Sequence, residues 1–236
     1  MLNNNFVALV ITFAVALAWL RVNDYAAHRG WISSHLSRKI IHIGTGPLYV
    51  ACWLLFTDAG ISRFLAALVP FSITIQFFLV GTGIIRDEAA VRAMSRTGDR
   101  REILRGPLYY GILFVILTII YWKDSPIGMV ALMLMCGGDG LADILGRQYG
   151  NKKIPWNSNK TLAGSAGMLI GGWTLSAAIL ALYVGMGVFI GPLTIYLAPL
   201  TVIALAGTLV ESLPIKDADN ITVTLTAVLL GHLLFR

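Results

Sequence analysis

Long apolar segments recur along this sequence, and they constrain its fold more than any other feature. Each is close to the roughly 17–25 residues that an α-helix needs to cross a bilayer. Charged residues make up only 13% of the chain, well below the ~25% typical of soluble domains. The sequence therefore predicts an all-α, polytopic transmembrane bundle that forms one integral-membrane domain over residues 1–236. Eight spans are expected, with seven as the alternative if one of the last two does not cross: 6–22, 40–56, 64–85, 107–122, 126–147, 162–184, 192–211 and 220–235.

The basic residues indicate how these spans are oriented. Of the 18 lysines and arginines, all but Arg63, Lys123 and Arg236 lie in the segments that join spans one and two, three and four, five and six, and seven and eight. Cytoplasmic loops of membrane proteins carry such an excess of positive charge. We therefore expect loops 86–105 and 148–160 to be cytosolic. Topology also accounts for the net charge of +6, so the expected partner is the lipid bilayer and not nucleic acid.

Two aspartates, Asp139 and Asp143, lie within the fifth apolar segment at a spacing of four residues, which places them on one face of a helix. A carboxylate at membrane depth is costly and usually functional. Gly138 and Gly140 beside them are expected to let another backbone or a ligand come close. Carboxylate oxygens followed by lysines suit a magnesium-bound polyphosphate. A structural pair satisfied by neighbouring helices and a proton or cation relay are the alternatives.

Three lysines, Lys152, Lys153 and Lys160, follow the acidic segment directly and are candidate phosphate ligands. Lysines that merely set the topology are the alternative. Gly164 and Ser165 begin the next helix, whose N-terminal N–H groups favour anions. The sequence here lacks the spacing of a P-loop.

A second basic group, Arg38, Lys39 and His42, opens the second segment and is expected to steady phosphates or an alcohol. A membrane anchor and a buried, hydrogen-bonded histidine are the alternatives for these residues. Glu211 ends the seventh segment, and Asp219 and Asn220 precede the eighth. These carboxylates are candidates for accepting a hydroxyl proton or for binding a second metal ion. A loop boundary and a helix cap are the alternatives.

Four motifs together resemble the phytol kinase and farnesol kinase family, which is grouped with the CTP-dependent polyprenol kinases that include dolichol kinase. The motifs are Arg38-Lys39-x-x-His42, Cys136-Gly-Gly-Asp139-Gly-x-Ala-Asp143-x-x-Gly146-Arg147, Lys160-x-x-Ala163-Gly164-Ser165, and Val210-Glu211-Ser212-Leu213-Pro214 with Asp219-Asn220. The resemblance covers most of the chain from Arg38 onward. The family often has two acids before the asparagine. Here Ala218 stands where the first would be, which leaves open whether Asp217 replaces it.

The resemblance implies a membrane kinase that transfers the γ-phosphate of CTP, with UTP as the alternative donor, to an isoprenoid alcohol such as phytol. It implies Mg²⁺ held by Asp139 and Asp143, and a thylakoid or plasma membrane of a photosynthetic cell. The alternatives are a farnesol, geranylgeraniol or dolichol kinase, a CTP-dependent cytidylyltransferase of a lipid phosphate, and a non-enzymatic transporter.

Overall fold

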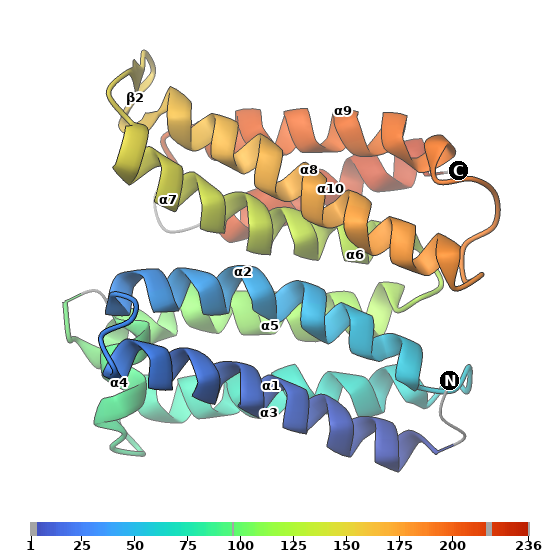
Figure 1. Ribbon diagram of the computed structural model, residues 1–236, viewed down its shortest axis with the longest axis horizontal. Coiled ribbons are helices and arrows are strands. Elements are labelled where there is room, and N and C mark those ends of the chain that lie inside the picture. Colours follow the sequence, from blue (N-terminus) through green and yellow to red (C-terminus); the bar gives the residue numbers. More distant parts are fainter. Residues whose placement is uncertain (1–3, 96, 216–218, 236) are drawn as a thin grey trace.

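The computed structural model describes residues 4–95, 97–215 and 219–235, and its helices form two groups (Figure 1). The first group holds α1, α2, α3 and α5, and the second holds α6 to α10. The helices are α1 (Asn5–His28), α2 (Ser34–Cys52), α3 (Ser62–Thr82), α4 (Glu88–Met94), α5 (Gly106–Tyr121), α6 (Pro126–Met133), α7 (Asp139–Tyr149), α8 (Leu162–Gly185), α9 (Thr194–Glu211) and α10 (Asp219–Leu234). Short 3₁₀ segments η1 (Trp53–Leu55) and η2 (Arg100–Leu104) follow α2 and α4.

The predicted all-α class is confirmed, but the structure does not show the predicted seven or eight spans. Within the described residues, six helical stretches are long and apolar enough to cross a membrane. The helix α2 is not among them, because His35, Arg38, Lys39 and His42 make its first half polar. The helix α10 is apolar but has only 16 residues. The six are Asn5–His28, Ser62–Thr82, Arg100–Tyr121, Pro126–Tyr149, Leu162–Gly185 and Thr194–Glu211.

The stretch Pro126–Tyr149 is the most buried of the six. It begins with the Ser125 side chain capping the N–H of Ile127, and Pro126 follows at the first helical position, where its missing N–H costs nothing. Between α6 and α7 the helix widens into one π-helical segment, η3 (Leu134–Gly138), which ends directly before Asp139. Such wide turns are rare and are often found at functional sites, because they release a carbonyl from the regular hydrogen-bond ladder.

Glycines let this central helix pack closely against its neighbours. A Cβ on Gly138 would lie 2.5 Å from the Sδ of Met168 on α8, and a Cβ on Gly140 would collide with Ile43 on α2. Small residues at helix interfaces allow this approach between membrane helices. Both glycines were predicted to let another backbone or a ligand come close. The structure places them at helix–helix contacts, and their role toward a ligand stays a prediction.

The predicted polar loop 148–160 contains a two-stranded antiparallel hairpin, β1 (Lys153–Ile154) and β2 (Asn157–Thr161). Its turn is fixed to the end of α9. Trp156 donates its indole N–H to Oγ of Ser212 at 3.1 Å, and the Asn157 amide donates to the carbonyls of Ser212 and Leu213, both at 3.1 Å. The hairpin therefore depends on α9 for its position.

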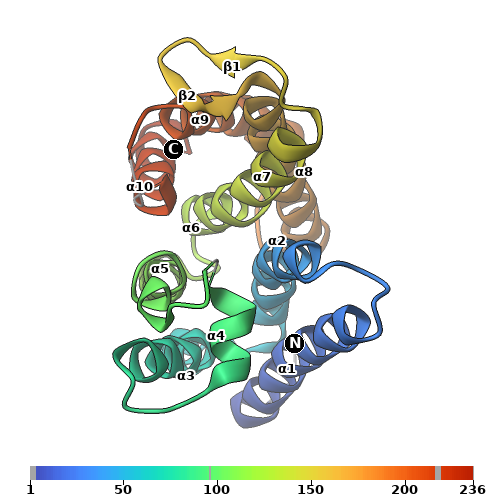
Figure 2. The same cartoon turned by 90° about the vertical axis from the view of Figure 1, so that its left-hand side faces the viewer.

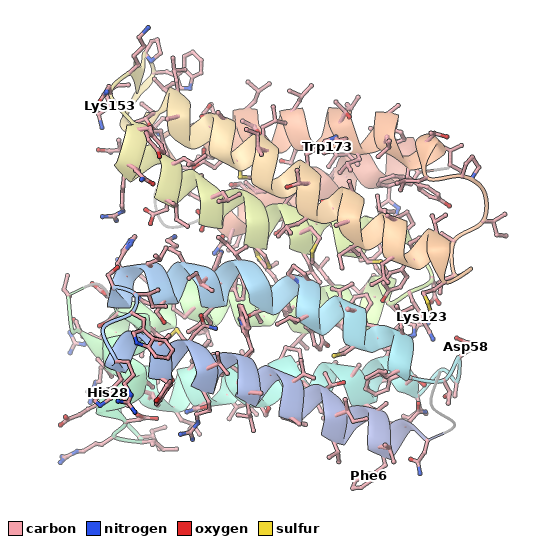
Figure 3. The ribbon with its side chains drawn as sticks, viewed as in Figure 1. Phe6, His28, Asp58, Lys123, Lys153 and Trp173 are labelled. Atoms are coloured by element: carbon pink, nitrogen blue, oxygen red, sulfur yellow. The ribbon has the colours of Figure 1, made fainter. Side chains whose placement is uncertain are left out.

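The charged loops gather at one end of the bundle. Figure 3 shows His28 and Lys153 at this end, and Asp58 and Lys123 at the other. Figure 2 looks at the first end, with the hairpin against the second helix group and α4 against the first. The two loops predicted to be cytosolic thus lie on the same side. That this side faces the cytosol stays a prediction from loop charge.

Candidate active site

A cavity of about 1090 Å³ opens at the end that carries the charged loops, between the two helix groups. Its walls come from α2, α4, α5, α7, the hairpin, α8, α9 and α10. Most of the predicted site residues line it, although they are far apart in the sequence. These are Lys39, Asp139, Asp143, Lys153, Lys160, Gly164, Ser165, Glu211, Asp219 and Asn220. The predicted residues that do not line it are Arg38, His42, Gly138, Gly140 and Lys152.

The aspartate pair faces one side of α2. Nζ of Lys39 lies 3.8 Å from Oδ2 of Asp139 and 3.5 Å from Oδ2 of Asp143. Nε2 of His42 lies 3.4 Å from Oδ2 of Asp139, and Nε2 of His35 lies 3.0 Å from Oδ2 of Asp143. The three α2 residues are spaced at i, i+4 and i+7, so they form one stripe along that helix. Two carboxylates and a stripe of nitrogen groups therefore meet across the α2–α7 interface.

His35 was not predicted as a site residue, whereas Arg38 was predicted together with Lys39 and His42. The guanidinium of Arg38 donates to the backbone carbonyl of Ser95 and links α2 to the loop after α4. The spacing of His35 from Lys39 was the signal that could have found it. A further basic residue, Arg147, lies one turn after Asp143, and its Nε donates to Oδ1 of Asp143 at 3.0 Å.

His42 is held from several sides. Its Nε2 lies 3.2 Å from the carbonyl oxygen of Met135, within the π-helical segment, as well as near Asp139. The Tyr110 ring lies 4.6 Å from the imidazole, centroid to centroid, and its hydroxyl donates to the backbone carbonyl of His42 at 3.0 Å. The same hydroxyl lies 3.0 Å from Sγ of Cys136. This network orients His42 toward Asp139. The π-helical segment contributes two of its contacts, the Met135 carbonyl and the Cys136 thiol.

The second charged cluster lies on the opposite part of the wall. Nζ of Lys160 on β2 donates to Oδ2 of Asp219 at 2.8 Å and also to Oε1 of Glu211. Glu211 is almost fully buried, with 3% of its side chain exposed. Burial alone would lower the pKa of Lys160, but hydrogen bonds to Asp219 and Glu211 raise it above its ordinary value. Lys160, predicted as a phosphate ligand, thus joins the hairpin to the ends of α9 and α10.

The remaining predicted residues divide between the cavity and its surroundings. Lys153 lines the cavity, whereas Lys152 does not. The start of α8 also lines it, with Thr161 capping the N–H of Gly164 at 3.0 Å. Arg105 and Arg147 add two more cations to the cavity wall. Asp217, considered as a substitute at the acidic position before Asn220, lies outside the described residues.

The aspartate pair suits a metal ion that arrives with a nucleotide. Among the described residues, no group of three or more His, Cys, Asp and Glu side chains forms a metal cage. Mg²⁺ is commonly held by only one or two carboxylates together with substrate phosphates and water. Oδ2 of Asp143 is buried and has ion-pair neighbours, but it accepts no hydrogen bond from any residue that the structure describes. It therefore has a lone pair available for a metal ion. The residues therefore fit magnesium bound jointly with phosphates.

Sequence comparison places this chain among known kinases. It is 41% identical over 230 residues to a probable chloroplastic phytol kinase from Triticum aestivum, covering 97% of this chain and 77% of that protein. It is 40% identical over 230 residues to a chloroplastic farnesol kinase from Arabidopsis thaliana, covering 97% and 75%. No model of a protein family matches the chain, and no solved structure matches it. The identity over nearly the whole length shows that the chain belongs to the phytol kinase and farnesol kinase family, whose members are isoprenoid-alcohol kinases.

Proposed function

We propose that this protein transfers the γ-phosphate of CTP to the hydroxyl of phytol, in the membrane of a photosynthetic cell, with Mg²⁺ bound by Asp139 and Asp143. The observation that carries the proposal is the meeting of this carboxylate pair with Lys39, Lys153, Arg105 and Arg147 in one cavity. Phosphoryl transfer depends mainly on positioning and charge neutralisation, and this cavity offers both kinds of group. The relatives named for phytol and farnesol support an isoprenoid acceptor.

Magnesium, when bound, would neutralise charge on the β- and γ-phosphates. The residues of the chain supply the rest. Lys153 on the hairpin and Arg105 at the start of α5 approach from different walls, so they can hold the phosphates in one orientation. Ser165, whose Oγ is buried and makes no hydrogen bond within the described residues, is a further donor at the cavity wall.

Asp219 is the proposed acceptor of the hydroxyl proton. Both candidate carboxylates are bound to Lys160, but 29% of the Asp219 side chain is exposed, compared with 3% of Glu211. A base must be within hydrogen-bonding reach of the proton it removes, and the more exposed carboxylate is the more accessible to a hydroxyl in the cavity. Glu211 then keeps Lys160 charged and in place.

The alcohol is proposed to reach the cavity sideways, between α5 and α10. These helices meet at the far end, where Oη of Tyr121 lies 2.8 Å from Nε2 of His232. At the other end, Pro107 near the start of α5 and Asn220 near the start of α10 both line the cavity. Large apolar residues on the outer faces of both helices, such as Ile116 and Leu229, are exposed as expected for lipid contact. An isoprenoid tail would remain in lipid while its hydroxyl entered the site.

A labelling assay tests the proposed function. Purified protein in detergent is given Mg²⁺, one of four nucleoside triphosphates, and phytol, geranylgeraniol, farnesol or dolichol. We expect the γ label of CTP to enter the lipid product, with phytol as the best acceptor. In a parallel reaction with phytyl phosphate in place of the alcohol, entry of the α label with release of pyrophosphate would establish a cytidylyltransferase instead. Absence of transfer from every donor to every alcohol would refute the kinase proposal.

A further inference from the structure

Lys39 lies between the two aspartates in a place that a metal ion would need. Its Nζ is 3.8 Å from one Oδ2 and 3.5 Å from the other, and both oxygens belong to the proposed metal ligands Asp139 and Asp143. A magnesium ion bound to these oxygens would lie about 2.0–2.1 Å from each. Because Nζ lies within 4 Å of the same two oxygens, such an ion would be close to the ammonium group and strongly repelled by it. The metal and Lys39 in its present position therefore exclude one another.

The contacts of Lys39 also allow it to leave. Both distances exceed those of ordinary charge-assisted hydrogen bonds, which are about 2.7–2.9 Å, so attraction between charges holds this side chain more than directional bonding. A lysine head group on a four-carbon stem reorients easily. Lys39 itself lines the cavity in which the phosphates are proposed to bind. A short movement would bring its ammonium group from the carboxylates to a phosphate.

We propose that Lys39 neutralises Asp139 and Asp143 in the nucleotide-free protein, is displaced by the incoming metal, and then binds a phosphate of the same metal–nucleotide complex. This inference rests on the proposed kinase function. It adds that the metal ion binds together with the nucleotide and not before it. Free metal gains little from the carboxylates alone, because it must displace Lys39 and leave this cation without a partner. Metal that arrives with a nucleotide supplies that partner. The site therefore discriminates against metal without nucleotide.

The test measures metal binding without any reaction. Mn²⁺, which replaces Mg²⁺ at oxygen sites, is titrated into nucleotide-free protein and followed by electron paramagnetic resonance. We expect weak binding to the wild type and at least about tenfold tighter binding to Lys39→Met, a difference of ~1.4 kcal/mol. Lys39→Arg keeps the positive charge and should bind Mn²⁺ as weakly as the wild type. Lys152, which lies directly before β1, does not line the cavity, so Lys152→Met removes a lysine elsewhere and should leave Mn²⁺ affinity unchanged.

Two further measurements complete the test. Adding Asp143→Asn to Lys39→Met should abolish the gain in Mn²⁺ affinity, which shows that the gained site is the carboxylate pair. Affinity for a non-hydrolysable CTP analogue with Mg²⁺ should fall about tenfold in Lys39→Met, because a phosphate ligand has been lost. Equal Mn²⁺ affinity of the wild type and Lys39→Met would overturn the inference, as would tighter Mn²⁺ binding by Lys39→Arg. Wild-type protein that transfers phosphate yet gives this result keeps its function and loses only the proposed role of Lys39.

Discussion

The cavity contains two clusters in which one lysine lies between two carboxylates, and they differ in how tightly the lysine is held. Lys39 lies 3.5–3.8 Å from Asp139 and Asp143, beyond hydrogen-bonding distance. Lys160 donates hydrogen bonds to both Glu211 and Asp219, the latter at 2.8 Å. The same three charges are thus arranged loosely on one wall and closely on the other. Charge alone does not distinguish a site that exchanges its cation from one that keeps it.

Location explains the difference. The Lys39 cluster joins two helix faces, where the backbone is already fixed by packing between α2 and α7, so its charges need not hold the fold together. The Lys160 cluster joins a hairpin to the ends of α9 and α10, so its charges link three separate elements. Removing one partner from a buried pair leaves an uncompensated charge and is strongly destabilising. The Lys160 cluster therefore holds the hairpin in place and keeps its cation, whereas the Lys39 cluster is free to exchange its cation.

The largest expected effect comes from the loose cluster. Asp143→Asn, which is nearly isosteric but supplies no negative charge, should lower kcat at least about 100-fold, or ~2.7 kcal/mol in barrier height. Raising Mg²⁺ should partly restore the rate if the defect is metal affinity, and the same holds for Asp139→Asn. The protein should still insert normally. Retention of more than about a tenth of the wild-type rate by both variants, a loss of only ~1.4 kcal/mol, would show the metal assignment to be wrong.

The same carboxyl-to-amide change in the tight cluster is the matched control. Glu211→Gln keeps an acceptor for Lys160 and leaves Asp219 as the charged partner. We expect the Mg²⁺ concentration for half-maximal rate to stay at its wild-type value. A large increase in that concentration would place Glu211 among the metal ligands and remove the distinction between the clusters.

A loss of stability is expected from Lys160→Met. The substitution leaves Glu211 buried and Asp219 beside it without their shared cation, and should lower the free energy of unfolding by about 3 kcal/mol. Thermal unfolding in detergent measures this, with Lys153→Met as the control because Lys153 is exposed on the same hairpin. If Lys160→Met instead unfolds like the wild type and only raises the KM for nucleotide, Lys160 is a phosphate ligand and the cluster opens during catalysis.

The sequence predicted the aspartate face because the helical period alone puts Asp139 and Asp143 together. It did not predict which face of α2 meets these aspartates, because Arg38 and Lys39 each share a helix face with His42. Only the rotation of α2, set by packing such as that of Ile43 against Gly140, decides between them. The partners of Lys160 were not predictable either, since Glu211 lies 51 residues away and meets it only through the hairpin. The widened helical turn before Asp139 has no sequence signal beyond its glycines.

A smaller loss of stability is expected where the hairpin is fixed to α9. Asn157→Ala removes two hydrogen bonds to the carbonyls of Ser212 and Leu213, one of which is buried. A net contribution of about 1 kcal/mol for each bond predicts a destabilisation of ~1–2 kcal/mol, measured by thermal unfolding. Displacing the hairpin should also raise the KM for nucleotide, because Lys153 moves with it. An unchanged KM together with lower stability would exclude Lys153 from nucleotide binding.

The smallest effect concerns pH. It tests how strongly the two carboxylates hold the charge of Lys160, without altering a ligand of the proposed metal. Because the pKa of Lys160 is raised in the folded protein, its contribution to stability is fully present below the ordinary lysine value of 10.5. It is lost only as pH rises through the higher folded-state value. The difference in melting temperature between the wild type and Lys160→Met should therefore be constant from neutral pH to 10.5 and shrink above it. Taking this difference cancels the titration of other lysines and tyrosines. A difference that already shrinks between pH 8 and 10 would mean that Lys160 loses its proton more easily than an ordinary lysine, and that burial outweighs its two carboxylates.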